Sequence, residues 1–156
     1  MAPVAAPPVR VSSAFELSLP SLDIDAPVIE AGVTASRVLQ IPEDPAVLGR
    51  WSDGARPGDG TGTIVLAGHV DYNGRPGALK TLLSLAVGDE AILASSDGEA
   101  RYVTERVDTY AKQVLPYEQI FLYDVPERLV LITCGGRFDR ASGHYESNVV
   151  AYLRRV

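Results

Sequence analysis

The sequence predicts an all-β domain, a closed or nearly closed antiparallel barrel with a few short helices. Its 14 glycines and 11 prolines fall mostly between short apolar segments, a spacing typical of many short strands. Helical signals are few and short, and the chain has no internal repeat. Because so many strands would otherwise present their edges to solvent, closure into a barrel is the favoured arrangement.

Seven apolar segments lie between these glycines and prolines, and we expect a strand in each. Asp97-Gly98 lies between the fourth and the fifth and is the strongest short-range hairpin signal in the chain. The predicted strands are Ala14–Leu19, Ala26–Val33, Thr63–His69, Glu90–Ala94, Ala100–Val107, Arg128–Thr133 and Tyr145–Leu153.

Two segments carry helical signals. The first is Ala78–Leu85. Its residues Leu79, Leu82 and Leu83 follow the i, i+3, i+4 spacing of one apolar helix face, enough for about two turns. The second is Pro116–Tyr123, in which proline would occupy the first helical position. Both helices are short, so the prediction of an all-β domain stands.

Length and composition describe one globular domain. A chain of 156 residues can bury a sizeable core, and its 46% hydrophobic and 22% charged residues exclude a disordered, fibrous or coiled-coil protein. No apolar run approaches the roughly 18 residues of a membrane span. We assign residues 14–156 to the domain and interpret residues 1–13, whose first ten include three alanines and three prolines with no periodicity, as a linker stub.

The net charge and the cysteine content limit the classes of partner and the compartments that fit this chain. The net charge of −6 gives no basic surface for nucleic-acid phosphates and no polybasic segment for an anionic bilayer, so we expect neither partner. Cys134 is the only cysteine, which excludes an intrachain disulfide. That is compatible with a reducing compartment, or with an extracellular protein that keeps one thiol free. Nothing in the sequence suggests an obligate dimer, and we expect a monomer.

Two other kinds of site are not favoured. The loop 53–62 is rich in glycine, but a strand-like segment follows it, whereas a phosphate-binding loop leads into a helix. His69, His144 and Cys134 lack the paired spacing of zinc ligands. We therefore predict no metal ion and no cofactor.

Cys134 is the candidate nucleophile. It ends an apolar segment and is followed by two glycines, a place where a substrate can reach a thiol, although a lone cysteine is more often a small buried residue. His69 also follows a strand-like segment, and is otherwise a loop histidine. Arg137 and Arg140 come shortly after the cysteine and are otherwise ordinary solvated arginines.

These three residue types together fit acyl transfer. A histidine can take the thiol proton, remain as imidazolium beside the thiolate, and later protonate a leaving amine. An arginine can donate hydrogen bonds to the oxyanion that develops on the attacked carbonyl. Whether the fold brings these side chains together is not visible in the sequence.

Three segments of the sequence resemble a known family, the sortases, which are cysteine transpeptidases of Gram-positive bacterial surfaces. Residues 19–30 resemble the opening strand of that family and its I-x-A-P-V turn. Leu66-Ala-Gly-His69 resembles the histidine segment, and Leu131-Ile-Thr-Cys134 resembles the TLxTC strand end, with Val130 in place of the first threonine. The likeness runs from about residue 15 to residue 153.

The segment after the cysteine resembles one class in particular. Cys134-Gly-Gly-Arg-Phe-Asp-Arg140 and the final strand Tyr145–Tyr152 are most similar to class F, a group of actinobacterial sortases. In well-known sortases the catalytic arginine lies farther along, on the strand after the cysteine. Of the three catalytic residues, the arginine is therefore the one whose position in this sequence follows least directly from the family pattern. The Phe-Asp-Arg context favours Arg140, with Arg137 as the alternative.

The resemblance implies an eight-stranded barrel with the site in a groove at one end. Cys134 would be the nucleophile, His69 the general acid and base, and Arg140 the catalytic arginine. Further candidates would contact the substrate or line the groove. For the groove candidates, a role in packing or a position in a solvated loop is at least as good an explanation. The candidates are Ala67, Gly68, Thr133 and Gly135 for the substrate, and Trp51, Asp71 and Tyr72 for the groove.

The resemblance also implies partners and a location. The substrate would be an LPxTG-type sorting signal, and Cys134 would cleave it after the threonine through a thioacyl enzyme. The acceptor would be an amine of a peptidoglycan precursor or a pilin lysine. The barrel would face the cell exterior or cell wall, held by an N-terminal membrane helix ahead of the stub. Two alternatives stay open, a sortase-like barrel that binds peptide without turnover and a cysteine hydrolase with water as acceptor.

Overall fold

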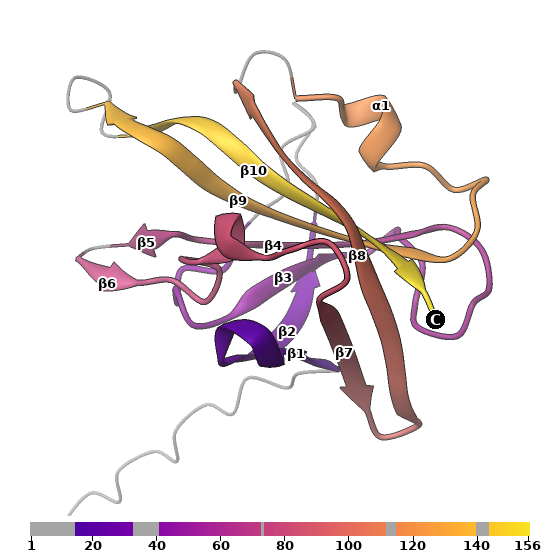
Figure 1. Cartoon of the computed structure of the whole chain (residues 1–156). Coiled ribbons are helices and arrows are strands. Elements are labelled where there is room, and N and C mark those ends of the chain that lie inside the picture. The colour runs from indigo at the N-terminus through magenta and orange to yellow at the C-terminus, as the bar shows by residue number, and fades with distance from the viewer. Residues whose placement is uncertain (1–14, 33–40, 73, 112–114, 140–143) are drawn as a thin grey trace, which may run out of the picture.

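The computed structural model describes residues 15–32, 41–72, 74–111, 115–139 and 144–156, with the backbone alone for 72, 134–139 and 144–146. Strands dominate (Figure 1). The strands are β1 (Phe15–Leu19), β2 (Ile24–Ala31), β3 (Leu48–Trp51), β4 (Thr63–Gly68), β5 (Asp71–Tyr72), β6 (Arg75–Pro76), β7 (Glu90–Ser95), β8 (Gly98–Ala111), β9 (Arg128–Asp139) and β10 (His144–Arg155). The helices are the 3₁₀ turns η1 (Pro20–Leu22) and η2 (Leu82–Ser84), and α1 (Tyr117–Ile120).

Eight of the described strands form a closed barrel in the order β1-β2-β3-β4-β9-β10-β8-β7, which confirms the all-β, eight-stranded prediction. The expectation of a purely antiparallel barrel was wrong. Within the described chain, β2 pairs with β3 and β4 pairs with β9 in parallel. A hairpin cannot join parallel strands, so the chain must cross over the barrel between the members of each pair. The parallel pairing of β4 with β9 is the one that matters for the site.

Most predicted elements are present, with revised bounds. The Asp97-Gly98 signal marks a real hairpin between β7 and β8, in which Gly98 pairs with Ser95 and takes a φ of 123°, a conformation that favours glycine. Pro116 directly precedes α1 as its N-cap. Strand β3 and the β5–β6 hairpin were not predicted, because β3 is buried on both faces and shows no alternation, and the hairpin strands have two residues each.

The predicted helix over Ala78–Leu85 was wrong in type and length. The backbone forms i→i−3 hydrogen bonds there, and only residues 82–84 are helical, as η2. Three residues per turn place every third side chain on one face. Leu79, Leu82 and Leu85 are accordingly buried, whereas Leu83 is 63% exposed. The leucine spacing therefore follows a 3₁₀ period and not an α-helical one.

Two apolar clusters pack on opposite faces of the same strands. On β4, Ile64 and Leu66 belong to a cluster that draws on all eight barrel strands, which places it in the barrel interior. Val65 and Ala67 belong to a second cluster with Ile120 of α1, which lies outside the barrel on the side of β9 and β10 (Figure 1). Because both faces are buried, β4 and the first half of β9 read as continuous apolar runs.

A buried arginine holds the loop that follows β3. Arg50 is 1% exposed, and its Nε and Nη2 donate to the two carboxylate oxygens of Glu30 at 3.0 and 2.8 Å. Its Nη1 also donates to the carbonyl oxygens of Gly54 and Ala55. Such a two-pronged pair is among the strongest of protein hydrogen-bonding arrangements. It fixes the start of the glycine-rich loop.

A buried carboxylate holds the rest of that loop. Glu127 accepts hydrogen bonds from the amides of Gly58 and Gly60, each at 2.9 Å, and from the hydroxyl of Tyr102 at 2.7 Å. The loop amides thus bind an internal anion. This gives the glycine-rich loop 53–62 a structural role that accounts for its composition without a phosphate ligand.

We expect Tyr102→Phe to lower the free energy of unfolding at neutral pH by about 1–3 kcal/mol, because buried Glu127 loses a hydrogen bond. Burial raises the pKa of Tyr102, and the Glu127 hydrogen bond and charge raise it further. The folded protein therefore keeps this proton above about pH 10, where the unfolded chain releases it, so Tyr102 costs stability as the pH rises past that point.

Urea unfolding at neutral and alkaline pH tests this prediction. The difference in stability between the wild type and Tyr102→Phe should narrow above about pH 10. Tyr123→Phe is the control, because Tyr123 is 62% exposed, and it should follow the wild type throughout. A difference that stays constant with pH would contradict the prediction.

Candidate functional site

The site forms where the parallel strands β4 and β9 end together. Their register runs from Thr63 opposite Arg128 to Gly68 opposite Thr133. His69 is the next residue after β4, and Cys134 is the next residue on β9. Because neighbouring strands lie about 4.8 Å apart, the fold sets the backbones of His69 and Cys134 side by side.

A buried hydrogen bond closes this strand end. The Thr133 hydroxyl donates to the Gly68 carbonyl at 2.7 Å, and Thr133 is 2% exposed. Ala67 is buried in the second apolar cluster, opposite Ile132. The three residues predicted to contact substrate here, Ala67, Gly68 and Thr133, therefore form the support directly behind the histidine and cysteine, with the side chains of Ala67 and Thr133 buried.

Two close backbone approaches support the histidine, and both need glycine. A Cβ on Gly68 would lie 2.4 Å from Cδ2 of Leu48, and a Cβ on Gly77 would lie 1.8 Å from the carbonyl oxygen of His69. The Gly77 amide donates to the Val70 carbonyl at 2.7 Å, which holds the segment after β6 against the chain at His69. The sequence analysis did not identify Gly77, since its partner comes from the tertiary structure.

The imidazole of His69 is half-buried and contacts the segment before β3. Its Nε2 lies 3.0 Å from the carbonyl oxygen of Pro42. Pro42 was also not predicted as a site residue, and nothing in its local sequence marks it as one. Asp71 and the backbone of Tyr72 follow in β5, which with β6 lies at the same end of the barrel as the end of β9 and the start of β10 (Figure 1).

The other predicted site residues lie away from this strand end, or their side chains are outside the described part of the structure. Trp51 is 6% exposed and packs its ring edge-on against Phe121 at 4.8 Å, so it is a core residue and not a groove residue. Gly135 lies on β9 opposite Ser147 of β10. Arg137 is placed only by its backbone on β9, and Arg140 lies outside the described residues.

The strands beyond Cys134 add polar residues that the sequence analysis missed. Asn148 of β10 lies opposite Cys134, and Tyr110 of β8 lies opposite Asn148. The Tyr110 hydroxyl donates to Asp108 at 3.1 Å and lies 3.1 Å from the hydroxyl of Tyr152. Burial and these two hydrogen bonds raise the pKa of Tyr110, so it stays a neutral phenol. Only the strand order places these residues near the cysteine.

An open hollow of about 350 Å³ lies beside the second apolar cluster. It is lined by Leu115, Pro116, Tyr117, Glu118 and Gln119, at the start of α1. Leu115, Ile41 and Tyr110 all pack on the cluster that contains Ala67 and Ile132. The same face that ends at His69 and Cys134 thus carries apolar side chains from three other segments.

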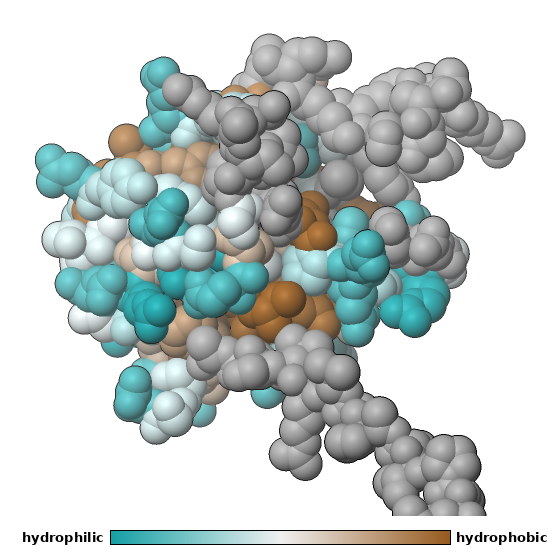
Figure 2. All heavy atoms as spheres, turned by 180° about the vertical axis from the view of Figure 1, so that it is seen from behind, coloured by the Kyte–Doolittle hydropathy of each residue, from teal (hydrophilic) through white to brown (hydrophobic). Residues whose placement is uncertain are grey.

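The described ranges carry neither a cluster of metal ligands nor a membrane-spanning helix. Among those residues, no group of three or more His, Cys, Asp or Glu side chains could hold a metal ion. None of the helices in the described part of the chain is long and apolar enough to cross a bilayer. Seen from behind, the most hydrophobic areas of the described surface are small and lie among hydrophilic residues (Figure 2).

Comparison with known proteins gives a consistent family. The family model "Sortase domain" matches residues 17–156. No curated protein sequence matches the chain. Among solved structures, the chain is similar to sortase C1 of Streptococcus agalactiae in complex with MTSET, with a TM-score of 0.70 and 16% identity over 91% of this chain.

Two further solved structures are equally informative. Sortase A of Corynebacterium diphtheriae matches with a TM-score of 0.70 and 16% identity over 92% of this chain. Sortase C-1 of Actinomyces oris matches with a TM-score of 0.69 and 18% identity over 91%. The chain spans 66% of the length of the streptococcal sortase, 60% of the corynebacterial one and 73% of the Actinomyces one. At these identities the likeness shows the fold.

We expect Gly77→Ala to displace His69, because the new methyl group would overlap the His69 carbonyl oxygen. The cost in unfolding free energy should be about 1–3 kcal/mol, as for other overpacked sites. The measurement is the position of the His69 ring signals in NMR spectra, together with urea unfolding.

Gly54→Ala is the matched control. Its Cβ would lie 2.7 Å from Cε3 of Trp51 and 2.8 Å from the Thr63 carbonyl oxygen, a milder overlap than at Gly77, in the loop after β3 and away from His69. It should lower stability and leave the His69 ring signals in place. Unmoved His69 signals in Gly77→Ala would contradict the prediction.

Proposed function

The chain belongs to the sortase family, and on that premise we propose that it is a cysteine transpeptidase with Cys134 as nucleophile and His69 as general acid and base. The observation that carries this is the parallel register of β4 and β9, which sets His69 beside the only cysteine in the chain. We assign the catalytic domain to residues 14–156.

The proposed reaction has two acyl transfers. His69 takes the thiol proton, and the Cys134 thiolate attacks the peptide carbonyl. His69 then protonates the leaving amine, and the acyl group remains on sulfur as a thioester. In the second half the acceptor amine attacks that thioester, His69 removes the amine proton, and the new amide leaves while the thiol is restored.

The oxyanion of each step needs hydrogen-bond donors. We assign this role to the guanidinium of Arg140, with Arg137 as the alternative, because arginine stays charged at every working pH. Backbone groups of Thr133 and Gly135 would lie beside the reacting carbonyl. In the described part of β10 the arginines are Arg154 and Arg155, at the end of the strand away from Asn148. They are therefore not candidates for this role.

Sortases act on sorting signals at the cell surface. For this chain we propose an LPxTG-type peptide, cleaved after its threonine, with an amine of a peptidoglycan precursor or a pilin lysine as acceptor. The open hollow lined by residues 115–119, beside the second apolar cluster, supports binding of an apolar peptide segment. Placement in class F is part of the same proposal.

Intact-protein mass spectrometry with an LPxTG-type peptide and an amine tests the function. The wild type should show a thioacyl adduct on Cys134 and a cleaved peptide joined to the amine. Cys134→Ala should give neither and should melt like the wild type. His69→Gln should lower turnover by about 10²–10⁴-fold, the usual contribution of a general acid and base.

Other outcomes separate the alternatives. Turnover in Cys134→Ala would overturn the proposal. Cleavage without joining to the amine would favour a hydrolase that uses water. If no peptide reacts, iodoacetamide decides: a labelled Cys134 points to a different sorting motif, and an inert Cys134 points to a barrel that binds peptide without turnover.

A further inference from the structure

We infer that the turn over residues 41–47 holds His69 in one tautomer, with its proton on Nε2, so that Nδ1 is the nitrogen that exchanges protons during the reaction. We further infer that Asp44 is the positioning residue that holds this turn. The inference rests on the proposed function for the role of His69. Its structural part, the tautomer, does not depend on turnover.

The tautomer follows from the partner of Nε2. The Pro42 carbonyl oxygen lies 3.0 Å from Nε2, and a carbonyl oxygen can only accept a hydrogen bond. Nε2 must therefore carry the proton in this contact. A neutral imidazole has one N–H, so Nδ1 then carries the lone pair that can accept a proton.

The turn that presents Pro42 is held by Asp44. Its Oδ1 accepts the amide of Ala46 at 2.9 Å, and its carbonyl accepts the amide of Val47 at 3.1 Å. The same Oδ1 lies 3.3 Å from Nη2 of Arg75, in an exposed ion pair with β6. An aspartate that caps its own turn in this way fixes the path of the chain around it.

A second set of contacts joins the turn to the opposite side of the histidine. The buried Pro45 offers its carbonyl to the Ala78 amide at 2.7 Å. Ala78 follows Gly77, whose backbone lies against the carbonyl of His69. The 41–47 turn and the 75–78 segment are thus tied to each other, and between them they hold His69 by its ring and by its backbone.

The assignment gives each proton a definite path. Nδ1 takes the proton from the Cys134 thiol, which leaves a thiolate and an imidazolium with both nitrogens protonated. Nδ1–H then protonates the leaving amine, and Nδ1 later removes the proton from the acceptor amine. The Nε2 proton stays on Nε2 throughout, where it is donated to the Pro42 carbonyl, and this hydrogen bond becomes charge-assisted while the ring is cationic.

The first experiment reads the tautomer directly. Long-range ¹H–¹⁵N spectra at a pH where the ring is neutral distinguish the two forms, and the chain has only two histidines. His144→Gln identifies the His69 signals, and Cys134→Ala removes any thiolate that would keep the ring charged. We expect the Nε2–H form. The Nδ1–H form, or an even mixture of the two, would overturn the inference whether or not the protein turns over.

The second experiment tests Asp44. Asp44→Ala removes both the acceptor for Ala46 and the ion pair, and we expect kcat to fall about tenfold or more through misplacement of the ring. KM for the peptide should change by less than about twofold, and His69 should become a mixture of tautomers. Asp44→Asn keeps an acceptor for Ala46 and should restore most of kcat, and Arg75→Ala, which loses the ion pair alone, should have a small effect.

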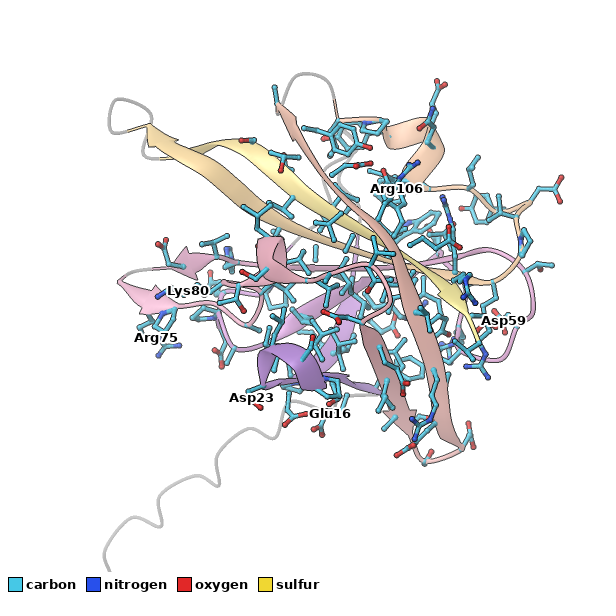
Figure 3. The ribbon with its side chains drawn as sticks, in the orientation of Figure 1. Glu16, Asp23, Asp59, Arg75, Lys80 and Arg106 are labelled. Atoms are coloured by element: carbon cyan, nitrogen blue, oxygen red, sulfur yellow. The ribbon has the colours of Figure 1, made fainter. Side chains whose placement is uncertain are left out.

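Asp59→Ala is the matched control. Asp59 also caps its own turn, with Oδ2 accepting the Arg56 amide at 2.8 Å, and it lies at the opposite end of the barrel from Arg75 (Figure 3). It should leave kcat and the His69 tautomer unchanged. If Asp44→Ala behaves like Asp59→Ala, the positioning role is refuted. If the wild type forms no product, iodoacetamide labelling of Cys134 decides the proposed function, and the tautomer spectra of the wild type and Asp44→Ala still decide whether the turn holds His69 through Pro42.

Discussion

The parallel pairing of β4 with β9 is the constraint on which the site depends. It runs over the whole of β4 and ends in the buried hydrogen bond from Thr133 to the Gly68 carbonyl. Strand spacing alone then places the residues after Gly68 and Thr133 next to each other. A slip of one residue would turn every side chain of the strand to the other face, so the two apolar clusters on either side specify the register.

Two buried charged residues hold the loop between β3 and β4 by hydrogen bonds to its backbone. Arg50 and Glu127 are almost fully buried, and each forms several hydrogen bonds to the backbone of the loop between β3 and β4. A buried charge is tolerable only when it is paired and hydrogen-bonded, and both are. They hold the barrel end far from His69, where Asp59 lies (Figure 3). The reactive end depends on backbone contacts instead, with Gly77 and Pro42 against the histidine.

This division suits a cysteine transpeptidase. A histidine that must give and take protons several times in one cycle needs a fixed ring orientation, and carbonyl groups supply one without adding a competing titratable group. The open hollow at residues 115–119 lies beside the second apolar cluster and offers a place for a peptide. In the proposed reaction, the support of the histidine, proton transfer and peptide contact would come from separate segments.

The all-β class, most of the strands and the hairpin at Gly98 can be predicted from the sequence, which also marks Cys134 and His69 as candidate site residues at strand ends. These follow from local signals, namely turn residues, apolar runs and short motifs. Only the tertiary structure decided the parallel pairings, the core position of Trp51, and the roles of Gly77, Pro42 and Asn148 beside the site. Those features arise from contacts between segments distant in the chain, for which no local pattern exists. The 3₁₀ period of the segment around Leu82 was misread for the same reason, because packing against the core selected it.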